Sequence, residues 1–210
     1  LNVGVILGLL SSLFSPLSND AELQKAAGWE LTGQVGGPTQ GIAVQGNYAY
    51  IGVGPRLVVV DISDPANPIQ VGASAALDDF VLGVAVSGTV AFVAAGGAGL
   101  QVVDIANLLA PSVIGAWHST GMAEGVAVAD DVAYVANGPY GLRVLDVSNP
   151  AVPVELAHAF EMNYAYDVTI SGHNAYIAAA GAGLLIVDIS NPAYPVELGA
   201  YDTPGYAHAV

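Results

Sequence analysis

One phrase returns four times along the chain, and it constrains the fold more than any other feature of the sequence. The copies are LVVVD at Leu57, LQVVD at Leu100, LRVLD at Leu142 and LLIVD at Leu184. A second phrase recurs at the same interval of about 42 residues, as GIAV at Gly41, GVAV at Gly83, GVAV at Gly125 and DVTI at Asp167. Self-similarity at a fixed period is the signature of repeat architectures, in which each unit buries its apolar surface against its neighbours.

Each unit reads as a set of short β-strands. Its β-branched and aromatic runs are separated by Gly, Asn, Asp and Pro, and no helical periodicity is visible. Four strands in about 42 residues are typical of one blade of a β-propeller. The sequence therefore predicts an all-β propeller with four nearly complete blades and partial strands of a fifth. Because Ala209 and Val210 begin another copy of the second phrase, we expect a fragment of a larger closed ring.

An aspartate ends the third strand of every unit. A short carboxylate just before a turn can accept hydrogen bonds from backbone N–H groups in an Asx-type turn. A catalytic aspartate is normally needed once, whereas this one recurs with the repeat. We therefore predict a structural role in the turn for Asp61, Asp104, Asp146 and Asp188.

The four copies of the first phrase resemble the motif of the LVIVD-repeat proteins, and the resemblance extends from Trp29 to Val210. It implies a β-propeller of the kind found mostly in exported or cell-surface proteins of bacteria and archaea. The family has no established catalytic residues, so the resemblance implies none in this chain.

The N-terminal segment differs from the repeats. Val3 to Phe14 is uncharged and mostly apolar, too short for a membrane span of roughly 20 residues but long enough for the core of a signal peptide. A short buried helix or strand is the alternative. We expect a signal peptide over 1–18, a linker over 19–28 and the propeller over 29–210. We also expect no stable membrane span in the mature domain and an extracytoplasmic location, secreted or at the cell surface.

Charge and composition exclude several classes of partner and site. The 18 acidic and 3 basic residues give a net charge of −15, and the basic residues are too scattered to follow a phosphate backbone. We therefore expect no nucleic-acid partner. The chain has no cysteine, which excludes disulfides, thiolate metal sites and a cysteine nucleophile.

Function is sought in what varies between the units, namely the links that lead into each first strand. In a propeller these links surround the mouth of the central channel, where ligands bind by default. The residues directly before each first strand differ in type, so binding and simple solvation remain equal alternatives for Gln40, Leu82, Glu124, Tyr166 and His208. Two residues earlier in each link, an apolar residue recurs at Phe80, Met122, Tyr164 and Tyr206. We favour packing between blades for these four side chains, and binding of a ligand is the alternative.

Histidines and carboxylates also occur in or beside these links. Such groups can bind a metal or act in acid–base chemistry. The spacing of His118, Glu124, His158, Glu161 and His208 matches no known ligand motif. We therefore predict no metal, no cofactor and no catalytic residue, and include His118 and Glu161 in the candidate binding face.

The sequence thus favours a non-enzymatic, exported β-propeller that binds a protein or a carbohydrate at the cell surface. One alternative is a propeller hydrolase or lactonase with a His/Glu site, with or without a metal, at the channel mouth. Another is a structural spacer in a larger surface protein.

Overall fold

The computed structural model describes residues 39–160 and 164–210, which form sixteen β-strands in four antiparallel four-stranded sheets. The first sheet contains β1 (Thr39–Gln45), β2 (Tyr48–Val53), β3 (Arg56–Asp61) and β4 (Ile69–Ala73). The second contains β5 (Gly83–Ser87), β6 (Val90–Ala94), β7 (Leu100–Asp104) and β8 (Ser112–Trp117). The third contains β9 (Gly125–Ala129), β10 (Val132–Ala136), β11 (Leu142–Asp146) and β12 (Val154–Ala159). The fourth contains β13 (Asp167–Ser171), β14 (Asn174–Ala178), β15 (Leu184–Asp188) and β16 (Val196–Tyr201).

Each sheet is a meander in which every strand pairs with the next along the chain, as a propeller blade requires. The predicted signal peptide over 1–18, the linker over 19–28, the start of the propeller at Trp29 and the candidate residue Glu161 lie outside the described residues. The ranges that the structure describes contain no helix long and apolar enough to cross a membrane.

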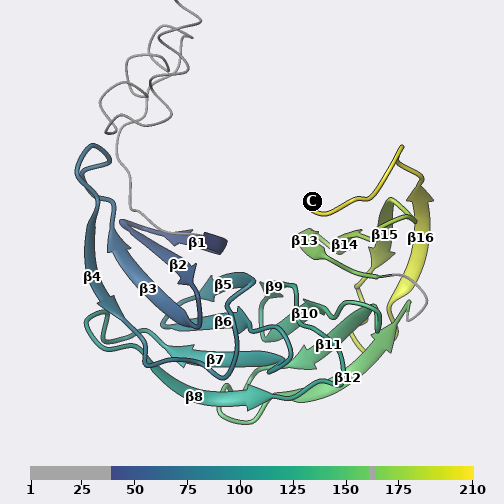
Figure 1. Cartoon of the computed structure of the whole chain (residues 1–210). Coiled ribbons are helices and arrows are strands. Elements are labelled where there is room, and N and C mark those ends of the chain that lie inside the picture. The colour runs from purple at the N-terminus through teal and green to yellow at the C-terminus, as the bar shows by residue number, and fades with distance from the viewer. Residues whose placement is uncertain (1–38, 161–163) are drawn as a thin grey trace, which may run out of the picture.

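The four sheets stand side by side in an arc, with β1, β5, β9 and β13 on its inner side (Figure 1). The outermost strands β4, β8, β12 and β16 form its outer side (Figure 1). The all-β propeller architecture predicted from the repeat is confirmed, as an open arc of four blades over the described ranges. Ala209 and Val210 follow as an irregular segment, and Val210 donates a backbone hydrogen bond to Asp167.

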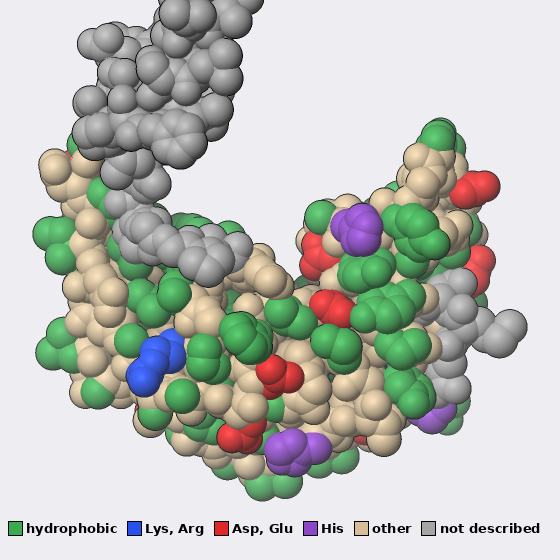
Figure 2. Space-filling model, in the orientation of Figure 1, with side chains coloured by type: hydrophobic (Ala, Val, Ile, Leu, Met, Phe, Trp, Pro, Cys, Tyr) green, Lys and Arg blue, Asp and Glu red, His purple; other side chains and the backbone are tan. Residues whose placement is uncertain are grey.

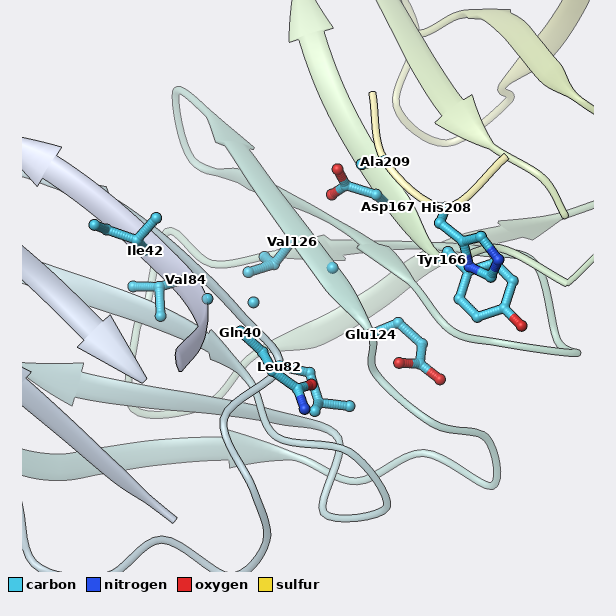
Figure 3. Close-up of a pocket in the computed structure, with 13 residues that line it drawn as sticks. Gln40, Ile42, Leu82, Val84, Glu124, Val126, Tyr166, Asp167, His208 and Ala209 are labelled. Atoms are coloured by element: carbon cyan, nitrogen blue, oxygen red, sulfur yellow. The ribbon is translucent and has the colours of Figure 1, made fainter. Parts of the chain in front are cut away.

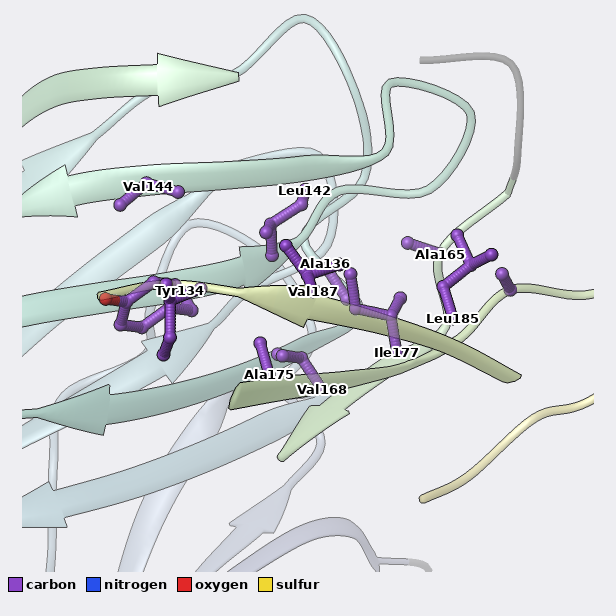
Figure 4. Packing of buried hydrophobic residues seen from close by; sticks show 12 residues of the cluster. Tyr134, Ala136, Leu142, Val144, Ala165, Val168, Ala175, Ile177, Leu185 and Val187 are labelled. Atoms are coloured by element: carbon purple, nitrogen blue, oxygen red, sulfur yellow. The ribbon is translucent and has the colours of Figure 1, made fainter. Parts of the chain in front are cut away.

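The core lies between neighbouring sheets. Three apolar clusters fill the spaces between the first and second, the second and third, and the third and fourth sheets. Figure 4 shows one of them, where Leu142 and Val144 of β11 face Ile177 and Val187 of the fourth sheet. The third strand of a unit is a continuous apolar run because neighbours can cover both of its sides.

The repeated aspartate has the turn role predicted for it. The Oδ1 atom accepts a hydrogen bond from the backbone N–H two residues later at 2.8 to 2.9 Å in every sheet, at Asp61, Asp104, Asp146 and Asp188. Hydrogen bonds from the side chain and backbone of Ser63 lower the pKa of Asp61. All four carboxylates are therefore part of the scaffold.

Candidate functional site

The links that vary between units lie at one end of the sheets. Isolated β-bridges join three of these links to the loop between the second and third strands of the preceding sheet, at Gly96–Ala123, Gly138–Ala165 and Ala180–Ala207. We call this end of the molecule, with its links and second-to-third-strand loops, the loop face. The turns between the third and fourth strands lie at the opposite end, because neighbouring strands run antiparallel.

A hollow of about 350 Å³ opens on the inner side of the arc and receives residues from all four sheets. The side chains predicted to surround the channel mouth all line it, namely Gln40, Leu82, Glu124, Tyr166 and His208. Figure 3 shows the Glu124 side chain between Leu82 on one side and the rings of Tyr166 and His208 on the other. One repeat position thus supplies an amide, an aliphatic group, a carboxylate, a phenol and an imidazole to one space.

Glu124 is held in place by a tyrosine from the next sheet's link. The Tyr164 hydroxyl donates a hydrogen bond of 2.7 Å to Glu124 Oε1. Burial and this bond to a carboxylate raise the pKa of Tyr164 to about 12. The hydroxyl therefore stays protonated at neutral pH and can remain a donor to Glu124.

Aromatic rings continue from this hydrogen bond along the loop face. The ring centroids of Tyr164 and Tyr166 are 4.5 Å apart, and those of Tyr166 and His208 are 4.4 Å apart. Tyr206 follows, with its centroid 6.2 Å from that of His208. These separations are typical of interacting aromatic pairs. We call these four residues the aromatic row; the sequence placed them in two rings but did not predict their contact.

Asp167 is a lining residue that the sequence analysis did not single out as a site. It begins the innermost strand of the fourth sheet, at the position that Gly41, Gly83 and Gly125 occupy in the other units. This replacement of a repeated glycine by a carboxylate could have identified Asp167 from the sequence. Its carboxylate accepts hydrogen bonds from the backbone of Val168 and Val210. Burial raises the pKa of Asp167, and these two donors act in the opposite direction.

The second predicted ring differs from the expectation that favoured packing between blades. Phe80 is 61% exposed, Met122 45% and Tyr206 71%, so packing between sheets does not account for them. Tyr164 alone among the four is partly buried and hydrogen bonded within the site. The links run over the loop face, which leaves these apolar groups in contact with solvent.

The other candidate residues do not join the hollow. His118 is exposed on the link after β8, and His158 lies on β12 with Nδ1 3.2 Å from Glu155 Oε1. Over the described ranges, no three His, Cys, Asp or Glu side chains are grouped so that they could hold a metal ion. Glu124 and His208 do share the hollow, which is where the hydrolase alternative would need them.

The charged groups that line the hollow are acidic. Glu124 and Asp167 are among its lining residues, and none of the lysine or arginine residues within 39–160 and 164–210 is. Arg56 donates to the Ser74 carbonyl oxygen at 2.9 Å, and Arg143 lies 3.2 Å from Glu155 Oε1. In Figure 2, acidic side chains border the hollow, whereas the basic side chains in view lie apart from it.

The solved structures that are similar to this chain include two computationally designed proteins. The crystal structure of the Ika8 protein matches with a TM-score of 0.63 and 13% identity, over 87% of this chain and 55% of Ika8. The crystal structure of the Ika4 protein matches with a TM-score of 0.59 and 9% identity, over 73% of this chain and 92% of Ika4. The chain thus spans about half the length of Ika8.

Sequence comparison gives the family. No curated protein matches the chain. The model of the LVIVD repeat matches it four times, over residues 36–75, 81–118, 120–158 and 163–203. These matches coincide with the four sheets, and the chain belongs to the LVIVD repeat family.

Proposed function

We propose that this protein is a non-enzymatic binding module, located outside the cytoplasm, that holds a protein or carbohydrate partner at its loop face. The observation that carries the proposal is the hollow, where one repeat position supplies five different side chains to a single space. The scaffold around it is repeated, whereas these five side chains differ from unit to unit. Such variation on a constant frame is typical of a surface adapted to a ligand.

The rim of the hollow supports the same interpretation. Phe80, Met122 and Tyr206 expose apolar groups beside it, and aromatic residues and methionine are enriched where proteins bind one another. Rings such as those of the aromatic row are also a surface on which sugars can stack. The extracytoplasmic location rests on the apolar stretch from Val3 to Phe14, which is typical of a signal-peptide core.

A hydrolase or lactonase is the alternative that one observation favours, because Glu124 and His208 line the same hollow. In an enzyme, E124Q or H208A would abolish turnover of an ester or lactone. In a binding module the wild type shows no turnover, and adding Ca²⁺ or Zn²⁺ leaves the melting temperature unchanged.

The test uses two matched triple variants of the chain. The loop-face variant is F80S/M122S/Y206S, and the control variant is L109S/V152S/Y194S, whose exposed apolar residues lie in turns at the opposite end. Wild type and both variants are applied to a glycan array and to isolated cell-surface proteins of the producing organism. We expect wild type and control to bind the same partner and the loop-face variant to lose it. A partner retained equally by the loop-face variant would overturn the proposal.

A further inference from the structure

The residues that line the hollow favour a positively charged ligand. Its lining includes the carboxyl group of Glu124 and the aliphatic side chains of Leu82, Val84 and Val126. The described basic side chains, Arg56 and Arg143, do not line it. An anionic ligand would therefore meet the carboxyl groups of Glu124 and Asp167, and no described lysine or arginine lies in the hollow to offset them.

The aromatic row adds an independent preference for a cation. Rings of tyrosine carry a negative face, which attracts ammonium groups placed within about 6 Å of the centroid. Tyr166 and His208 form one wall of the hollow next to Glu124 (Figure 3). The carboxylate is also fixed, because Tyr164 donates to its Oε1 atom. A fixed carboxylate beside aromatic faces is an arrangement that binds a cation with little loss of side-chain entropy.

We propose that the hollow receives a lysine side chain of a partner protein, with the ammonium group at Glu124 and the aliphatic stem against Leu82 and the rings of Tyr166 and His208. The proposal rests on the binding function above and names the chemistry that the loop face recognises. Lysine fits because it joins an apolar stem to a compact cation. An amino sugar would also supply a cation, but it lacks the unbranched aliphatic stem that Leu82 and the two rings would contact.

The net charge of the chain strengthens the approach of such a partner without specifying where it binds. A field from −15 charges attracts any cation toward the protein, and salt screens it within about 10 Å at 0.1 M. The local contribution of Glu124 must therefore be separated from that field. Glu197, which is exposed on β16 and does not line the hollow, offers a control with the same change of charge.

The experiment titrates Nα-acetyl-lysine methylamide into the full chain and follows the ring signals of Tyr166 and His208 by NMR. Nα-acetyl-norleucine methylamide, which has a similar stem and no amine, is the neutral control, and glucosamine is the competing cation. We expect saturable shifts with the lysine analogue and binding at least about tenfold weaker for norleucine and for the E124Q variant, which keeps an acceptor for Tyr164. The E197Q variant should bind like wild type.

Three outcomes would overturn the proposal: equal binding of the norleucine analogue, equal weakening by E124Q and E197Q, or preferential binding of glucosamine. The partner assay with the two triple variants separates this inference from the proposed function. If the loop-face variant loses its partner while the lysine analogue does not bind, the lysine proposal fails and the binding function stands. If the loop-face variant keeps its partner, the binding function itself fails.

Discussion

The first sheet and the two middle sheets have nearly the same sequence pattern but different surroundings. Ile42 of β1 is 59% exposed, whereas Val84 of β5 and Val126 of β9, at the same repeat position, are each 8% exposed. The preceding sheet covers Val84 and Val126. The repeat thus specifies an apolar surface on every sheet, and at this position of the innermost strand the preceding sheet buries it.

The fourth sheet shows the same effect on its other side. Tyr134 and Leu142 of the third sheet are buried against the fourth, whereas Tyr176 and Leu184 at the equivalent positions are only partly buried. A middle sheet therefore has two covered faces, whereas the outer face of the fourth sheet is partly open. Equivalent substitutions should consequently have unequal effects, which gives a way to test the comparison.

The largest difference is expected for Leu142→Ala against Leu184→Ala. Leu142 is fully buried between two sheets, so its truncation should lower the free energy of unfolding by about 3 kcal/mol through lost burial and a cavity. Leu184 is partly exposed and should lose about 1 kcal/mol. Guanidinium denaturation of both variants measures this difference. Equal losses would show that the outer surface of the fourth sheet is covered in solution.

A smaller difference is expected at a glycine in the outermost strand. A Cβ on Gly115 would overlap the carbonyl oxygen of Pro150 and lie 2.9 Å from Ala151 Cα, both in the next sheet. A Cβ on Gly199, the equivalent residue of the fourth sheet, would have no atom within 4 Å. Gly115→Ala should therefore lower the free energy of unfolding by about 1 kcal/mol or more, from overpacking. Gly199→Ala should leave it unchanged or slightly raised.

Thermal denaturation of the two glycine variants, made side by side, gives the comparison. Ala157 occupies this position in the third sheet, so a turn with other residues can make room for a methyl group. If Gly115→Ala leaves the melting temperature unchanged, the turn around Pro150 makes room for a methyl group as easily as the turn that faces Ala157.

The sequence alone predicted the four blades, the turn aspartates and five of the residues that line the hollow, because each follows from the period of the repeat. It did not predict that Phe80 and Met122 would be exposed, since a fixed repeat position does not reveal the path of a link. The bond between Tyr164 and Glu124 also escaped prediction, because it joins residues from two units. Asp167 was missed for a simpler reason: it stands in the repeated strand, where variation was not sought.

The fourth sheet also differs from the others in the loop between β14 and β15, where an alanine stands in place of a glycine. Replacing this alanine with glycine should stabilise the protein. Ala180 has a φ of 46°, and glycines with φ between 48° and 58° stand at the equivalent positions Gly54, Gly96 and Gly138. Alanine is strained in the left-handed region by about 1 kcal/mol, part of which glycine loses again through its greater entropy in the unfolded state.

Ala180→Gly should therefore raise the free energy of unfolding by about 0.5 kcal/mol, and the reverse change Gly138→Ala should lower it. Chemical denaturation of both variants and the wild type measures these changes, provided that the three m-values agree. A destabilised Ala180→Gly variant would contradict the comparison, because it would mean that the Ala180 methyl group contributes packing that the three glycines lack.

The smallest effect is expected at the turn aspartates, where the second sheet has Ala106 and the others have serine. Hydrogen bonds from the side chain and backbone of Ser148 lower the pKa of Asp146 below its ordinary value. A lowered carboxyl pKa means that the unfolded chain binds more protons near that pH. The stabilisation is complete above the unfolded value of 3.8 and is lost as the pH falls through the lowered value.

Ser148→Ala removes the side-chain donor but keeps the backbone bond, so the pKa of Asp146 should rise part of the way toward its ordinary value. NMR titration of the side-chain carboxyl carbon measures it, and Asp188, whose pKa is lowered by Ser190, is the control in the same sample. Stability should also fall less steeply with decreasing pH in the variant than in the wild type. An unchanged pKa for Asp146 would show that the backbone N–H alone sets it, in which case serine and alanine are equivalent in this turn and the second sheet differs from the others in sequence only.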